Sequence, residues 1–150
     1  MAIAGGKLGM YPHGNEILVV VHDAERRELI ARLLSAEGFT VAAAGDGLTA
    51  LRACANQRFG VIVAATDMPG SIDGFAIVRR ARHRQPWLKA LYTGEPATRV
   101  ALAHTDMADF IAAPFERAEL VGCVFELLHR SAGSEAADLC RRVRAEVRVS

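Results

Sequence analysis

This chain has little that would place it in a membrane, a disulfide-stabilised fold or a nucleic-acid complex. Its 150 residues contain no apolar run near the length of about 18 that a membrane span needs, and the glycine-rich start has no signal-peptide core. Positive and negative charges almost cancel at +1, so no global charge draws the chain to nucleic acid or lipid. The three cysteines, Cys54, Cys123 and Cys140, are too widely spaced for a metal or redox motif, which favours small buried side chains in a cytoplasmic protein.

What the chain does have is a regular alternation of short apolar runs and helical patterns. The expected buried strands are Glu16–Val21, Phe39–Ala43, Val61–Ala65, Leu88–Tyr92 and Ala108–Ala112. The expected helices follow Asp23, Asp46 and Gly74, with a short one at Arg99–His104 and a long one at Glu116–Arg130. This alternation predicts an α/β fold, a doubly wound five-stranded parallel sheet with helices on both faces.

The two ends of the chain differ from this pattern. We expect residues 1–14 to form a flexible leader. Residues 15–130 contain the whole strand-helix alternation, which we expect to form one domain. Residues 131–150 begin with a linker of small residues and continue as an amphipathic C-terminal helix, whose apolar side carries Leu139, Val143 and Val147. About 20 residues are too few for a helix-turn-helix output domain, so we expect a stand-alone domain with one extra helix.

Several short motifs follow the strands at matching places. Met68-Pro69-Gly70 and Asp73-Gly74 follow the third strand, Thr93 follows the fourth, and Pro114-Phe115 follows the fifth. Together with the apolar first strand, these motifs resemble the receiver domain of bacterial two-component response regulators, the CheY-like family. The resemblance covers about residues 15–130, with one extra residue between Gly70 and Asp73.

The resemblance implies a phosphoryl-transfer pocket, and this chain lacks most of it. In receivers, two acidic residues after the first strand and an acceptor aspartate hold Mg²⁺, while a hydroxyl and a lysine stabilise the transferring phosphoryl group. The matching positions in this chain are Val21, His22, Ala65, Thr93 and Ala113. Only the hydroxyl of Thr93 remains, so the resemblance implies a pseudo-receiver with no cofactor, lost Mg²⁺ binding and no enzymatic activity.

Two carboxylates near these positions leave an alternative open. A slip of one residue after the first strand would bring Asp23 into the acidic pair, and Asp67 lies two residues beyond Ala65. Either could act as a displaced phosphoacceptor in a working phosphorelay. The simpler interpretation is that both cap helices or turns. His22 has no second ligand at a suitable spacing for a metal site.

Without a phosphoryl switch, function would lie in surfaces. Phe110 matches the family's switch aromatic, although a core role is the simpler interpretation. The apolar residues of the last helix cover an arc of about 200°, more than one sheet face needs, with Cys123 and Phe125 at its edges. Together with the tail, this helix predicts an interaction face for a sensor histidine kinase, another regulator or a second copy of the chain, and not for nucleic acid or membrane.

The sequence therefore favours an atypical response regulator that acts in bacterial signal transduction as a phosphorylation-independent protein-interaction module. The first alternative is a functional phosphoacceptor that uses Asp67 or Asp23. A second alternative is a ligand-sensing domain, because Val21, Ala65 and Ala113 would leave the pocket roomier and more apolar.

Overall fold

A five-stranded parallel sheet forms the centre of the computed structural model, which describes residues 16–70, 72–95 and 108–129. The strands run in the order β2-β1-β3-β4-β5, and every neighbouring pair is parallel. Strand bounds are Glu16–Val20 (β1), Thr40–Ala44 (β2), Val61–Ala65 (β3), Lys89–Gly94 (β4) and Ala108–Ala112 (β5). Helix bounds are Ala24–Ala36 (α2), Gly47–Asn56 (α3), Gly74–Arg84 (α4) and Arg117–His129 (α5).

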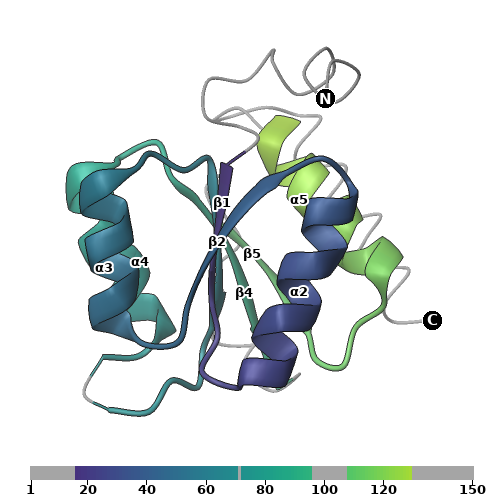
Figure 1. Ribbon diagram of the computed structural model, residues 1–150, viewed down its shortest axis with the longest axis horizontal. Helices are drawn as coiled ribbons and strands as arrows, with labels where there is room; N and C mark the ends of the chain where they lie inside the picture. Colours follow the sequence, from purple (N-terminus) through teal and green to yellow (C-terminus); the bar gives the residue numbers. More distant parts are fainter. Residues whose placement is uncertain (1–15, 71, 96–107, 130–150) are drawn as a thin grey trace.

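Helices cover both faces of this sheet, which confirms the predicted fold class. Helices α3 and α4 lie side by side on one face, and α2 and α5 lie on the other (Figure 1). The central strands β1 and β3 are buried on both faces from Ile17 and Val61 onward, which is why they read as unbroken apolar runs. The expected leader (1–14), the helix at 99–104, and the linker with its C-terminal helix (131–150) lie outside the described residues.

Local capping explains where the helices begin and end. Asp23, Asp46 and Asp73 each precede a helix and accept a hydrogen bond from a backbone N–H three residues later. The first two caps were predicted, and the third places Gly74 inside its helix. After α2 the chain turns at Gly38, whose φ of 99° lies in the left-handed region that glycine adopts without strain.

Helix α3 packs on the sheet through its smaller residues. Ala50 and Cys54 face the sheet, whereas Leu48 is 61% exposed and Ala55 is also exposed. Small residues allow α3 to approach the sheet closely, so the larger Leu48 lies outside the contact. Two of the three cysteines, Cys54 and Cys123, are buried, as their spacing predicted.

The wide apolar arc of α5 is used largely within the domain. Cys123 is only 1% exposed, and the half-buried ring of Phe125 lies 5.2 Å from the ring of Phe39, which follows α2. Phe110 on β5 is fully buried. The expectation that Phe110 and Cys123 contact a partner is therefore corrected to core packing, because neither offers exposed surface. Leu139, Val143 and Val147 lie outside the described residues.

Candidate site at the carboxyl ends of the strands

Three of the five pocket positions meet at the carboxyl edge of the sheet. Ala65 at the end of β3 is in register with Thr93 on β4, and the next backbone N–H, that of Thr66, donates to the Thr93 carbonyl oxygen at 2.9 Å. On the other side of β4, the N–H of Ala113 donates to the carbonyl oxygen of Gly94 at 2.8 Å. The backbone thus places Ala65, Thr93 and Ala113 in the neighbouring positions that the resemblance predicted.

The end of β1 brings the other two positions to the same edge. Val21 is buried, and its N–H donates to the carbonyl oxygen of Ala44 at 3.1 Å. His22 is exposed, and its Nδ1 donates a hydrogen bond to the carbonyl oxygen of Gly45 at 3.3 Å. The imidazole therefore points toward the loop after β2.

Arg27 holds this loop, and sequence reasoning did not single it out. Its Nη1 donates to the carbonyl oxygens of Val21 at 2.8 Å and His22 at 3.0 Å. The same nitrogen would lie 2.7 Å from a Cβ atom added at Gly45, so the guanidinium lies against the loop after β2 as well. A fixed cation therefore organises the edge where receivers carry an acidic pair. Arg27 is one of three arginines in α2, and nothing in the sequence pattern distinguishes it from the other two.

Thr93 carries the most unusual polar group at the edge. The residue is fully buried, and its Oγ1 makes no hydrogen bond with the described part of the chain. The hydroxyl therefore does not bond its own turn within the described residues. Buried polar atoms are rarely left without a partner, because the lost hydration is not recovered. Thr93 is in register with Ala65, the strand position where a methyl group replaces the family's carboxylate.

The two displaced carboxylates lie in different environments. Asp23 is the N-cap of α2, and its Oδ2 accepts from the Arg26 N–H at 2.9 Å. Asp67 is exposed on the loop beyond β3. Downstream of that loop, a Cβ atom at Gly74 would come within 2.1 Å of the Ala65 carbonyl oxygen, so glycine is required for α4 to pack against the end of β3.

Comparison with known proteins identifies this arrangement. The family model of the response regulator receiver domain matches residues 17–125, most of the chain. This chain belongs to that family. Response regulator MprA of Mycobacterium sp. (strain KMS) is 34% identical over 125 residues, which cover 81% of this chain and 54% of that protein. Transcriptional regulatory protein TcrA of Mycobacterium tuberculosis (strain ATCC 25618 / H37Rv) is 33% identical over 110 residues, covering 71% of this chain and 43% of that protein.

Solved structures agree with the assignment. The receiver domain of NtrX from Brucella abortus is 28% identical, with a TM-score of 0.68 over 77% of this chain and 99% of that one. A response regulator receiver protein from Sinorhizobium medicae WSM419 shares the fold at 24% identity, with a TM-score of 0.68 over 75% of this chain and 93% of that one. The chain spans about half the length of the curated relatives it matches. It is therefore a receiver domain of two-component signalling.

The donor set of this receiver does not fit Mg²⁺. Magnesium prefers six oxygen ligands in octahedral geometry, and Val21 and Ala65 offer no side-chain oxygen. The nitrogen of His22 is a poor ligand for so hard a cation. Among the described residues, no three His, Cys, Asp or Glu side chains converge on a metal-sized space.

Lysine is also missing from the carboxyl edge. Within the described ranges the chain has one lysine, Lys89, at the amino end of β4. Its Nζ donates to the Leu127 carbonyl oxygen of α5 at 2.5 Å, at the opposite end of the sheet from Ala113. No other lysine in the described ranges takes the place of the lysine that the family carries at the position of Ala113. No helix in the described part is long and apolar enough to cross a membrane.

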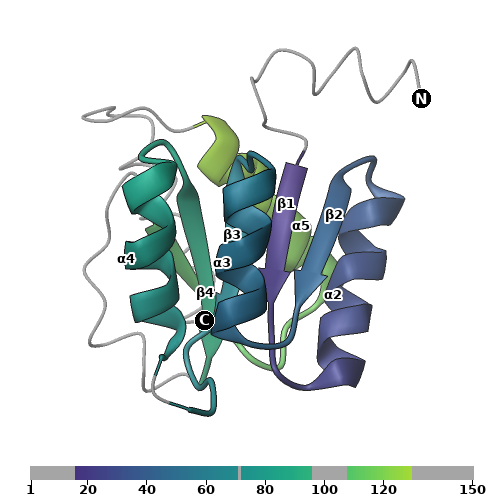
Figure 2. The same ribbon diagram turned by 60° about the vertical axis from the view of Figure 1, so that its left-hand side comes forward.

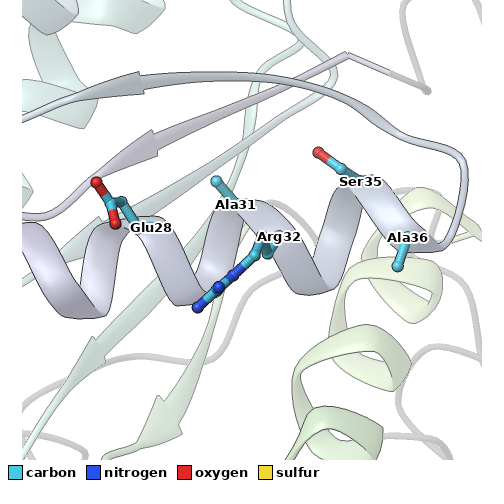
Figure 3. A pocket seen from close by; sticks show the side chains of 5 residues that line it. All are labelled: Glu28, Ala31, Arg32, Ser35 and Ala36. Carbon is cyan, nitrogen blue, oxygen red and sulfur yellow. The ribbon is translucent and has the colours of Figure 1, made fainter.

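A cavity opens beside the altered pocket. It has a volume of about 320 Å³, and its walls combine apolar and charged side chains: Arg26, Leu29, Asp67, Gly94, Glu95, Ala113, Pro114 and Phe115. A separate shallow hollow lies on the outer face of α2 and is lined by short side chains with Glu28 and Arg32 (Figure 3). Only the first hollow adjoins the positions where receiver chemistry takes place.

Burial favours the neutral form of two titratable side chains, Tyr92 on β4 and Cys54 on α3. Burial raises the pKa of the Tyr92 phenol, which packs on Phe75 with ring centroids 4.7 Å apart, while the guanidinium of Arg82 acts in the opposite direction. Burial likewise raises the pKa of the Cys54 thiol on α3. At the surface, the backbone N–H of Thr49 lowers the pKa of Asp46 by bonding its carboxylate.

Proposed function

We propose that this receiver domain acts without phosphorylation, as a protein-interaction module in two-component signalling. The observation that carries the proposal is the methyl group of Ala65 at the acceptor position, in register with the unbonded hydroxyl of Thr93. A methyl group cannot accept a phosphoryl group. Because Val21, His22 and Ala113 also replace charged partners, the nucleophile, the metal ligands and the charge clamp are absent together.

Arg27 supports this proposal from the other side of the pocket. Its guanidinium ties together the loop that would carry the acidic pair, through two carbonyl oxygens. A bound metal ion is not needed to order a loop that is already held in this way. We therefore propose that the domain keeps one arrangement of its carboxyl edge, needs no cofactor and catalyses no reaction.

The partner class follows from the family. Receiver domains generally partner with histidine kinases, and we propose a sensor histidine kinase, another regulator or a second copy of this chain as the partner. Phe125 is the one half-buried member of the expected interaction face within the described residues, and its ring already contacts Phe39. The tail residues Leu139, Val143 and Val147 remain candidates from their sequence pattern alone.

Acetyl phosphate provides the direct test. We expect the wild-type chain, incubated with acetyl phosphate and Mg²⁺, to show no mass increase of one phosphoryl group by intact-mass spectrometry. Millimolar Mg²⁺ alone should leave the melting temperature unchanged, because Val21, His22 and Ala65 provide no oxygen ligands. A phosphorylatable receiver treated in parallel provides the positive control.

A stable phosphoryl adduct on the wild type would overturn the proposal and favour a displaced carboxylate. Asp67→Asn and Asp23→Asn then distinguish the two positions, since each removes one carboxylate with little change in size. Loss of the adduct only in Asp67→Asn would place the acceptor on the loop after β3. Loss only in Asp23→Asn would instead place it at the N-cap of α2.

The cavity of about 320 Å³ favours small-molecule binding as a second candidate function. Its volume lies at the lower end of the range for ligand pockets, and its walls pair the apolar Leu29 and Phe115 with the charges of Arg26, Asp67 and Glu95. Such a lining suits a compact molecule with an apolar body and at least one charged group. The cavity adjoins Ala113, where receivers carry a lysine.

Refilling this cavity tests the second function. In a thermal-shift screen of amphipathic metabolites, we expect a compound that raises the melting temperature of the wild type to lose its effect in Ala113→Lys, whose longer side chain enters the cavity. Ala118→Lys is the matched control, because Ala118 is exposed on α5 outside the cavity. Equal shifts in both variants would show that the compound binds elsewhere.

A further inference from the structure

Beyond their N-cap aspartates, Asp46 and Asp73, helices α3 and α4 carry only basic charged side chains. From Gly47 to Thr66 and again from Gly74 to Gly94 the sequence contains no aspartate or glutamate. The same two segments contain six arginines: Arg52, Arg58, Arg79, Arg80, Arg82 and Arg84. On the opposite layer, α2 carries both signs of charge, with two glutamates and three arginines. The nearly neutral chain thus concentrates positive charge on one face of the sheet.

Most of these arginines are exposed on the same layer. Helices α3 and α4 pack side by side, as two views of the domain show (Figures 1 and 2). The exposed basic side chains on this layer are Arg52, Arg58, Arg79, Arg80, His83 and Arg84. Arg82 is different, because its Nε donates to the Leu88 carbonyl oxygen at 2.9 Å and its side chain is partly buried. Arg82 thus ties the end of α4 to the chain entering β4 and leaves the other cations at the surface.

Two large apolar side chains are exposed on this layer as well. Leu48 is 61% exposed in the first turn of α3, and Trp87 is 40% exposed just after α4. The Nε1–H of Trp87 donates to the Phe59 carbonyl oxygen at 2.9 Å, which fixes the ring, and the guanidinium of Arg58 lies 5.4 Å from its centroid. Rigid aromatic rings and arginines are the side chains that most often anchor protein interfaces.

We propose that the α3–α4 face, formed by these exposed basic residues with Leu48 and Trp87, binds an acidic, amphipathic helix of a partner protein. Arg80 and Arg84 are four residues apart, so they lie one above the other on α4, one helical turn of about 5.4 Å apart. Glutamates four residues apart on a second helix repeat at the same pitch. Leu48 and Trp87 provide contacts for the apolar side chains of that helix.

Charge distribution favours this occupant over nucleic acid. A nucleic-acid-binding domain normally carries a large net positive charge, whereas this chain carries +1. The acidic residues elsewhere on the molecule would repel a long polyanion that extends beyond the face. A short acidic helix avoids that repulsion, since it covers only α3 and α4. The proposed interaction does not depend on whether another residue serves as the phosphoacceptor in place of Ala65.

A designed peptide tests the proposal on the full chain. The probe is a fluorescein-labelled amphipathic peptide of about 20 residues, with glutamates four apart and leucines along the adjacent side of the helix, so that both can contact the α3–α4 face. A second peptide with glutamine in place of glutamate serves as the uncharged control. Binding is followed by anisotropy and, with unlabelled peptide, by the fluorescence of Trp87, the chain's single tryptophan. We expect binding of the acidic peptide, weakened by salt because exposed charges are screened.

Charge-reversal variants locate the binding surface. We expect Arg80→Glu and Arg84→Glu each to weaken binding several-fold, and the double variant by about tenfold or more. Arg32→Glu is the matched control, since it reverses an exposed arginine at mid-helix on α2, on the other side of the sheet (Figure 3). Arg80→Gln and Arg84→Gln provide a milder pair, and circular dichroism verifies that every variant is folded.

The possible outcomes separate the proposal from its rivals. Salt-sensitive binding of the acidic peptide that is lost in the double variant and kept in Arg32→Glu supports it. Equal losses in Arg32→Glu and the α4 variants would overturn it, because the effect would then come from overall charge. Tighter binding to a DNA oligonucleotide or to phosphatidylglycerol vesicles would also overturn it, and so would the absence of peptide binding at low salt.

Discussion

Restoring the four missing side chains should convert this receiver into a phosphoacceptor. We expect a variant with Val21→Asp, His22→Asp, Ala65→Asp and Ala113→Lys to gain one phosphoryl group from acetyl phosphate and Mg²⁺, where the wild type gains none. The physical reason is that the backbone already places these positions together. Ala65 is in register with Thr93, and the backbone N–H of Ala113 donates to the carbonyl oxygen of Gly94, the residue after Thr93 on β4. Only the chemistry of the side chains is missing.

The restored variant should also become magnesium-dependent in stability. Ala65 and Val21 are at most 2% exposed, so carboxylates introduced there are desolvated and repel each other. Without metal we expect a loss of about 1–3 kcal/mol in the free energy of unfolding. Mg²⁺ should recover part of it by pairing with the new charges, and the melting temperature should rise with millimolar Mg²⁺ only in the variant.

A triple variant that keeps Ala65 provides the control for this experiment. It has the acidic pair and the lysine but no acceptor, so a mass increase in it would mean that another residue is modified. If the folded quadruple variant stays unmodified, the four side chains are not sufficient. The extra residue between Gly70 and Asp73 would then be the first feature to remove, because it lengthens the loop after β3.

Much of this fold was predictable because its signals are local. Strands such as Val61–Ala65 read as short apolar runs, and the caps Asp23 and Asp46 stand directly before their helices. The pocket positions were predictable for a related reason, since parallel strands end at one edge and the motifs fix where each strand ends. The sequence pattern did not show which side of α3 faces the sheet, because its approach depends on the small residues Ala50 and Cys54, while Leu48 is exposed.

Long-range polar contacts gave no comparable signal. Arg27 binds carbonyl oxygens, which every residue carries, so no sequence pattern marks its partners. The arc of α5 predicted a surface contact, yet Phe125 meets Phe39, more than 80 residues earlier in the chain. A helix pattern shows how much surface is apolar and does not show whether the same domain covers it.

Gln85 is the clearest example of a contact that sequence could not reveal. It is only 2% exposed, and its side-chain amide joins three segments at the amino edge of the sheet. Its Oε1 accepts from the Phe59 N–H at 2.9 Å, before β3. Its Nε2 donates to the carbonyl oxygens of Cys54 and Gln57, both at 2.8 Å, near the end of α3. One amide thus satisfies three backbone groups between α3, α4 and β3.

Gln85→Ala should therefore lower the free energy of unfolding by about 3–5 kcal/mol, measured by urea denaturation. Two buried backbone groups and one partly buried one lose their partner at once, and each buried unsatisfied group costs about 1–3 kcal/mol. Gln85→Leu keeps the volume without the hydrogen bonds, so a similar loss in it would assign the effect to polarity instead of packing. Asn56→Ala, at an exposed site where Nδ2 donates to the Arg52 carbonyl oxygen, should cost less than about 1 kcal/mol. If Gln85→Leu were as stable as the wild type, the amide would be a space-filling residue and the three segments would be joined by packing alone.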